Sequence, residues 1–176
     1  MSDITSVFLP HLRNVEPDAQ FTFSLPIVTS SAGNKYYAKL GNATESDQYI
    51  GEVESLKAIH AAAPGLAPRV FASGVAAGDS NKRPYFLSEY KDIESLSVKS
   101  AELLGKRLAT ELHVFKSDKG YGFDVPTYCG ATRQENGWYE SWEECYGSMI
   151  ENLLLKLKGR RGSTELIAKG EEVRSR

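Results

Sequence analysis

Residues 36–65, YYAKLGNATESDQYIGEVESLKAIHAAAPG, decide the fold of this chain of 176 residues. The stretch opens with aromatic and apolar residues that favour a β-strand, and Lys39 stands near the end of that strand. From residue 46 to residue 63, apolar side chains recur every three or four positions, which predicts an amphipathic helix. Pro64 and Gly65 end it. The sequence therefore predicts a strand followed directly by a helix.

The lysine on this strand needs an anionic partner if it borders an interior cleft, because an unpaired buried ammonium is costly. Glu52 on the predicted helix is the available partner. Glu54 lies on a different face of the helix and is the less favoured one. A strand lysine, a helix glutamate and a later strand that ends in a polar linker form the arrangement of the protein-kinase small lobe. Spacing alone leaves the alternative open, a solvated lysine and a surface glutamate.

The remaining strands are predicted from β-prone runs. Residues 21–29 and 35–40 are joined by small, turn-forming residues, which predicts a hairpin. Two more strands are expected at residues 69–75 and 84–90, and the second leads into the polar turn Lys91-Asp92. With the helix between the two pairs, the pattern predicts a small antiparallel sheet with one inserted helix.

Apolar periodicity predicts further helices at residues 100–115, 142–157 and 164–174, with a break at residues 159–162. A short helix at residues 3–14 is expected to be interrupted or kinked at Pro10. The predicted class is therefore α+β. We expect residues 1–90 to form a kinase-like N-lobe, and residues 91–176 to form a linker and the first helices of an incomplete C-lobe.

The composition is that of an ordinary globular protein, with 41% hydrophobic and 25% charged residues. A net charge of -2 gives no electrostatic reason to expect nucleic acid or an anionic membrane as a partner. The two cysteines form no CxxC pair, which favours free thiols in a reducing compartment. The N-terminus lacks the apolar run of a signal peptide or membrane span, so a cytoplasmic protein is expected.

The second unusual stretch is residues 121–146, called the aromatic segment below, which reads YGFDVPTYCGATRQENGWYESWEECY. It holds both tryptophans, both cysteines and four of the nine tyrosines. Aromatic rings interleaved with polar side chains suit a surface that stacks against a carbohydrate-like ligand. The alternative is an aromatic corner that caps a core.

The amino-acid sequence of these stretches resembles that of the fructosamine kinase family, also called ketosamine 3-kinases or protein-ribulosamine 3-kinases. The resemblance covers residues 35–146 and is carried by YYAKL, YIGEVESLKAIHAAAPGLAPRVFASGV, YFLSEYKDI, LLGKRLATELHVF and the aromatic segment. It implies a protein kinase-like fold and a transferase that moves the ATP γ-phosphate to O3 of a sugar on a protein amine, which leads to deglycation. The implied substrates are glycated proteins or small ketosamines.

By position, the resemblance implies that Lys39 holds the phosphates of ATP and that Glu52 orients it. Glu89, Tyr90 and Lys91 would form the linker whose backbone meets adenine. In the aromatic segment, Asn136, Trp138 and Trp142 match family positions. We hypothesise that these three line one wall of the sugar pocket.

The family's catalytic loop carries a His-Gly-Asp motif followed by an Asn, and a later Asp holds Mg²⁺. In this chain the three histidines are followed by Leu, Ala and Val, so no such motif is present. We therefore assign no catalytic residue and no metal ligand, although Mg²⁺ is expected for the family. The resemblance fades after Leu157, which indicates a family member truncated before its catalytic loop and inactive alone.

The family's phosphate-binding turn is rich in glycine, whereas residues 16–24 contain none and Gly33 belongs to the later hairpin turn. Nucleotide affinity is therefore expected to be weak. Two alternatives stay open. The chain could be a non-catalytic module that binds a nucleotide or a glycated ligand, or self-associates through apolar surface. It could also be a gene model cut short.

Overall fold

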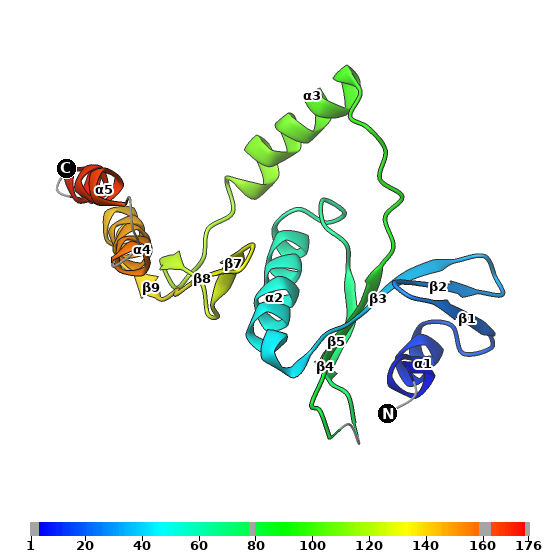
Figure 1. Cartoon of the computed structure of the whole chain (residues 1–176). Coiled ribbons are helices and arrows are strands. Elements are labelled where there is room, and N and C mark those ends of the chain that lie inside the picture. Colours follow the sequence, from blue (N-terminus) through cyan, green and yellow to red (C-terminus); the bar gives the residue numbers. More distant parts are fainter. Residues whose placement is uncertain (1–3, 78–79, 159–162, 175–176) are drawn as a thin grey trace. The chain divides into compact units, whose positions relative to one another are not determined.

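The computed structural model describes residues 4–77, 80–158 and 163–174 (Figure 1). The chain divides into two compact units, Met1–Phe115 and Lys116–Arg176, which we describe separately. The expected division into an N-lobe of residues 1–90 and a C-lobe part of residues 91–176 stays a prediction. Among the described helices, none is both long and apolar enough to cross a bilayer.

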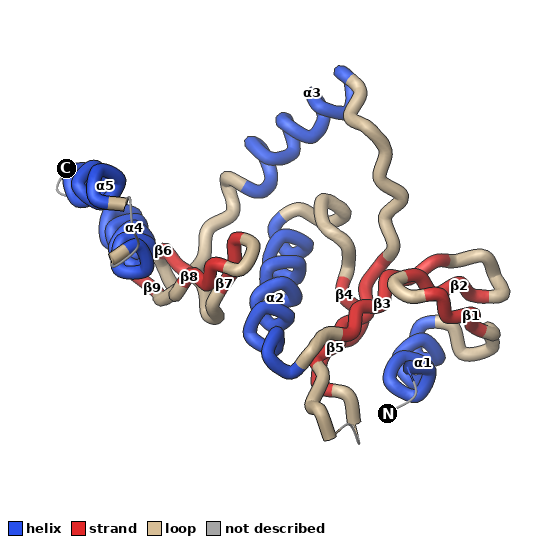
Figure 2. Tube along the Cα trace, viewed as in Figure 1, coloured by secondary structure: helices blue, strands red, loops and turns tan. Residues whose placement is uncertain are grey.

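The first unit is built on an antiparallel sheet of five strands in the order β1-β2-β3-β5-β4 (Figure 2). The strands are β1 (Phe21–Ser24), β2 (Ile27–Ser30), β3 (Lys35–Leu40), β4 (Val70–Val75) and β5 (Pro84–Glu89). The helix α2 (Ser46–Ala62) is inserted between β3 and β4. The predicted α+β class and the sheet with one inserted helix are thus confirmed.

The run predicted as one strand at residues 21–29 is two strands. β1 and β2 pair with each other, with Phe21 opposite Ser30 and Ser24 opposite Ile27. The chain reverses at Leu25 and Pro26, because proline fixes φ and has no N–H to donate to a ladder. The predicted hairpin is the next one, β2 to β3. Lys39 therefore lies on the third strand of the sheet.

Helices cover the two faces of the sheet (Figure 1). On one face, Phe8 and Leu12 of α1 (Ile4–Val15) pack with Leu87 of β5. On the other face, residues of α2 pack with Phe86. Because neighbouring strand residues point to opposite faces, Phe86 and Leu87 anchor two separate clusters. The helix α1 runs through Pro10 without the expected interruption.

The helix predicted at residues 100–115 begins two residues earlier and ends sooner. α3 (Val98–Arg107) starts after Ser97, whose Oγ accepts a hydrogen bond from the Ser100 backbone N–H at 3.1 Å. The π-helical stretch η2 (Leu108–Leu112) follows. Phe115, expected on the apolar face, lies beyond the helix and is exposed.

The second unit contains two small two-stranded sheets followed by a pair of helices. Its elements are β6 (Tyr121–Gly122), β7 (Thr127–Cys129), β8 (Thr132–Gln134), β9 (Trp138–Tyr139), α4 (Trp142–Leu157) and α5 (Thr164–Arg174). Both helices have the predicted bounds, and the predicted break at residues 159–162 lies outside the described residues. Cys129 and Cys145 are free thiols, as expected.

Candidate functional site

Lys39 on β3 forms an ion pair with Glu52 on α2. The Nζ atom of Lys39 lies 2.6 Å from Oε2 of Glu52. Glu54, the less favoured partner, instead pairs with Lys57 of its own helix at 2.7 Å. The structure contains the predicted pairing, while the two side chains remain partly solvated, with 32% of Lys39 and 37% of Glu52 exposed. Glu52 and not Glu54 reaches Lys39, because residues two positions apart on a helix point in different directions.

A pocket of about 290 Å³ adjoins this ion pair, between α2 and the end of β5. Its size is near the lower end of the ~300–1,000 Å³ typical of ligand pockets. Apolar and aromatic side chains dominate the lining, with charged groups at the linker. The lining residues are Tyr37, Glu52, Leu56, Pro68, Phe86, Ser88, Glu89, Tyr90, Lys91 and Ile93.

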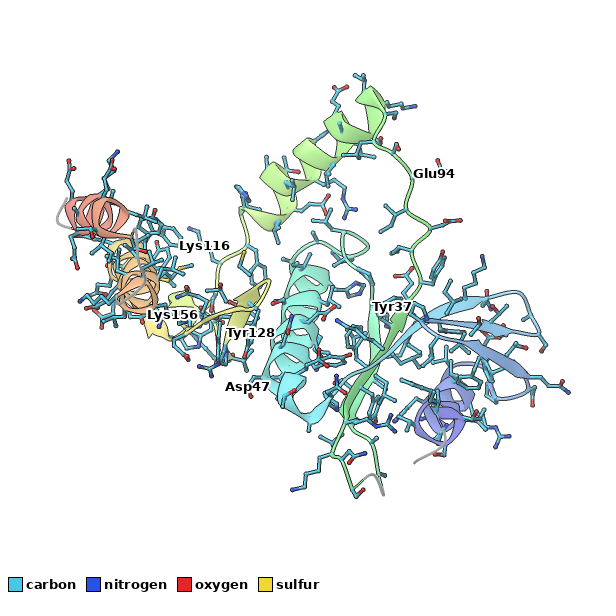
Figure 3. All side chains as sticks on the ribbon, viewed as in Figure 1. Tyr37, Asp47, Glu94, Lys116, Tyr128 and Lys156 are labelled. Atoms are coloured by element: carbon cyan, nitrogen blue, oxygen red, sulfur yellow. The ribbon has the colours of Figure 1, made fainter. Side chains whose placement is uncertain are left out.

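The pocket gathers four of the five residues predicted to bind ATP, namely Glu52, Glu89, Tyr90 and Lys91. The fifth, Lys39, is joined to it through Glu52. Tyr37, labelled in Figure 3, comes from β3 and packs on the α2 side of the sheet. The structure thus brings the predicted residues together, and their role in nucleotide binding stays a prediction.

The linker after β5 is fixed by contacts of Glu89. One carboxylate oxygen of Glu89 lies 2.7 Å from Lys91 Nζ, and the other accepts from the Arg69 backbone N–H at 3.3 Å. The hydrogen bond from Lys91 lowers the pKa of Glu89, with smaller contributions from Arg69 and His60. The carboxylate is therefore charged near neutral pH. Since β5 ends at Glu89, Tyr90 and Lys91 lie outside the strand, and both residues line the pocket.

The β1–β2 hairpin occupies the place that the phosphate-binding turn has in a kinase-like small lobe, two strands before the lysine. Its turn, at Leu25 and Pro26, contains no glycine. Gly33, with φ of +87°, belongs to the β2–β3 turn as the sequence indicated. Pro26 also lacks an N–H, so this turn offers phosphates fewer backbone donors than a glycine-rich one.

The aromatic segment uses two of its three candidate residues for internal contacts. Asn136 donates from Nδ2 to the Val125 carbonyl at 2.8 Å and to Thr127 Oγ1 at 3.0 Å. Trp138 donates from Nε1 to Asp124 at 2.8 Å. These bonds hold the loop between β6 and β9 in place. They give Asn136 and Trp138 a structural function that the sequence did not indicate.

Trp142 differs from the other two candidates because 57% of it is exposed. Its ring stacks on that of Tyr146 with centroids 5.7 Å apart, and the ring centroid of Tyr121 lies 6.3 Å from that of Trp142. An exposed indole in an aromatic cluster is suited to stacking on a ligand. The role of Trp142 in a sugar pocket stays a prediction.

No metal site emerges from the described residues. Within residues 4–77, 80–158 and 163–174, no three His, Cys, Asp or Glu side chains lie close enough together to hold an ion. We therefore assign Mg²⁺ no ligand among these residues.

Comparison with known protein families gives a match over most of the chain. The model of the family described as fructosamine kinase matches residues 22–176. A chloroplastic protein-ribulosamine 3-kinase of Arabidopsis thaliana is 28% identical over 140 residues, which are 78% of this chain and 41% of that protein. A probable ketoamine kinase of Vibrio parahaemolyticus is 27% identical over 131 residues, 71% of this chain and 43% of that protein.

Solved structures show the same fold. A crystal structure described as a fructosamine-3-kinase of Haemophilus somnus superposes with a TM-score of 0.63 at 18% identity, covering 91% of this chain and 57% of that one. A Thermobifida fusca structure described in the same way gives a TM-score of 0.58 at 17% identity, covering 86% and 54%. The chain thus spans about half the length of the proteins it matches.

Proposed function

Because the chain belongs to the fructosamine kinase family, we propose that its first unit binds ATP for the phosphorylation of protein-bound ketosamines. The observation that carries the proposal is the Lys39–Glu52 ion pair beside the pocket under the linker. A lysine fixed by a helix glutamate next to an aromatic-lined pocket is the arrangement that kinase-like folds use for nucleotides.

In this proposal the parts of the pocket have separate tasks. The apolar lining, with Phe86 and Leu56, takes the adenine ring, and the backbone at Tyr90 and Lys91 hydrogen-bonds its edge. Lys39 contacts the phosphates while Glu52 holds its ammonium in place. Bound ATP supplies the phosphoryl group that is transferred. Binding is weak because the β1–β2 turn has no glycine.

The proposed acceptor is a ketosamine on a glycated protein or on a small amine, the class named for the plant and bacterial relatives. The two free thiols suit a reducing compartment, so we place the protein in the cytoplasm. We assign Trp142 to the wall of the sugar pocket, because its ring is exposed. Binding of a fructosamine mimic tests the wall. Trp142→Ala should lower the affinity, and an unchanged affinity in a folded variant would remove Trp142 from the site.

A chain without a His-Gly-Asp sequence is not expected to transfer phosphate by itself. A coupled ATP assay with a ribulosamine substrate checks this. The expected result is a rate no higher than that of Lys39→Met, and turnover above that control would contradict it.

Nucleotide binding is tested by calorimetry with ATP. Replacing Lys39 by Met removes a charged hydrogen-bond donor, a loss of about 1.5–3 kcal/mol, so ATP affinity should fall about tenfold or more. The matched control is Lys57→Met, which removes the lysine of the other ion pair of α2, between Lys57 and Glu54. Equal affinities for the two variants would overturn the proposal.

A second candidate function is a non-catalytic module that self-associates. The observation in its favour is a run of exposed apolar side chains around the start of α3. Ile93 is 86% exposed, Val98 89%, Leu96 66% and Leu103 59%. An apolar surface of this kind marks an interaction site when it is contiguous.

A further inference from the structure

The ammonium of Lys39 contacts aromatic rings as well as Glu52. Its Nζ atom lies 4.8 Å from the ring centroid of Tyr49 and 5.6 Å from that of Phe86. Phe86 is directly opposite Lys39 in the β3–β5 ladder. Tyr49 belongs to α2, three residues before Glu52, and residues at that spacing share a helix face. Helix α2 therefore contacts Lys39 through two side chains, the carboxylate of Glu52 and the ring of Tyr49.

The Tyr49 ring is held firmly in this place. It is only 6% exposed and packs edge-to-face on Phe86, with centroids 5.8 Å apart and planes at 63°. Gly41, in the loop after β3, also lies against this ring. A Cβ atom at Gly41 would lie 2.6 Å from the Tyr49 ring, so the ring fits only because residue 41 has no side chain.

The hydroxyl of Tyr49 carries no charge near neutral pH. Burial is the main cause that raises the pKa of Tyr49 to about 12, and the nearby Glu45 and Glu52 carboxylates and Tyr37 contribute to this rise. The ring therefore presents an uncharged aromatic face to the lysine. A cation is attracted to such a face, by an amount that grows as water is excluded.

We propose that Tyr49 is a positioning residue for Lys39, acting through the face of its ring. Glu52 and the two rings contact part of the ammonium. The rest of the ammonium is open to a ligand, since 32% of the Lys39 side chain is exposed. That open part is where an anionic phosphate group would be bound. This inference rests on the proposed function, and it adds Gly41 as the residue that admits the ring.

Three variants test separately the Tyr49 ring, its hydroxyl and the space that the ring occupies. Tyr49→Phe keeps the ring face, Tyr49→Leu removes it, and Gly41→Ala leaves Tyr49 intact but fills its place. Calorimetry measures the affinity of each for ATP and for adenosine. We expect ATP affinity to fall about three- to tenfold in Tyr49→Leu and Gly41→Ala, with no change in Tyr49→Phe.

Adenosine distinguishes positioning from a general structural effect, because it has no phosphates for Lys39 to contact. Its affinity should stay the same in all three variants. A parallel loss of ATP and adenosine affinity would overturn the proposal, and so would wild-type ATP affinity in Tyr49→Leu. If Tyr49→Leu fails to fold, Gly41→Ala gives the same comparison.

A second readout keeps the inference separate from the proposed function. The ε-methylene protons of Lys39 should be shifted upfield by the rings in the wild type and in Tyr49→Phe, and should move toward the free-lysine position in Tyr49→Leu and Gly41→Ala. If wild-type protein binds no ATP, the proposed function fails, and these signals still decide whether Tyr49 positions Lys39. Unshifted methylene protons in the wild type would overturn the positioning role.

Discussion

Lys39 and Glu52 keep 32% and 37% of their side chains exposed, so their ion pair is largely screened by water. A pair of this kind contributes about 0–1 kcal/mol to folding. Its importance lies in orientation, since it holds an ammonium beside the pocket at a defined place. Stability and ligand affinity should therefore respond differently when the pair is broken.

Replacing Glu52 by Gln tests this separation. The free energy of unfolding, measured by urea titration, should fall by about 1 kcal/mol or less. ATP affinity should fall about tenfold, because Lys39 loses the charged partner that orients it. Glu54→Gln, which removes the partner of Lys57, is the matched control and should leave ATP affinity unchanged. A large loss of stability without a loss of affinity would contradict the account.

Glu16 makes folding depend on pH. Its carboxylate accepts hydrogen bonds from Tyr36 and, at 2.9 Å, from Asn34. The Tyr36 bond is the main cause that lowers the pKa of Glu16 in the folded state. The resulting stabilisation is complete above the ordinary glutamate pKa of about 4.3 and is lost as the pH falls through the lowered folded value.

Tyr36→Phe should therefore destabilise the protein more at pH 6 than at pH 3. Urea titrations at both pH values measure the difference in unfolding free energy from the wild type. Tyr90→Phe, a matched loss of one hydroxyl at the linker, should show the same difference at both pH values. A pH-independent effect of Tyr36→Phe would refute the role given to Glu16.

At the scale of elements, the helix α4 depends on its N-terminal cap. Ser141 Oγ accepts from the Glu144 backbone N–H at 3.1 Å, and Glu144 Oε2 accepts from the Ser141 N–H at 3.3 Å. Ser141→Ala should cost about 1 kcal/mol, whereas Ser141→Asp should keep the cap. Tryptophan fluorescence follows this unfolding, because both tryptophans belong to the second unit. Equal stability of the Ala and Asp variants would exclude the capping role.

Sequence predicts well the helices α2, α4 and α5 and the strands β3, β4 and β5, whose runs are long enough to display a period. The 3.6-residue repeat fixed α4 and α5 at both ends and placed Glu52, rather than Glu54, toward Lys39. The split of residues 21–29 into β1 and β2 is not predicted, because both strands are rich in β-prone residues and only Pro26 marks the turn. The strands β6 to β9 were missed because two or three residues cannot display a period.

The residues of the site are predicted only in part from the sequence. Its ion pair follows from helix geometry, and its linker residues follow from a family resemblance. The pocket itself brings together Tyr37, Pro68 and Ser88 from three separate segments, which only the folded chain shows. In the sequence, Tyr49 occupies an apolar position of the predicted helix, and an aromatic residue at helical spacing usually belongs to a core. The contact between its ring and the Lys39 ammonium forms only in the folded chain.

For the whole molecule, exposed apolar surface predicts self-association. Sedimentation velocity over a hundredfold concentration range should show a rising average mass. Ile93→Glu with Val98→Glu should suppress the rise, because it places charge on the two most exposed of these side chains. Val15→Glu, a change at an exposed apolar residue of α1, is the control. A monomer at every concentration would exclude the second candidate function.

The central claim is that the pocket between α2 and the linker, with Lys39 beside it, is a nucleotide site. The most direct test is an NMR titration of the isotopically labelled chain with adenosine and then with ATP. The account predicts that both ligands shift the backbone amides of Tyr90 and Lys91, and that ATP alone shifts the Lys39 side chain. Shifts confined to other surfaces, or no shift with millimolar ATP, would contradict it.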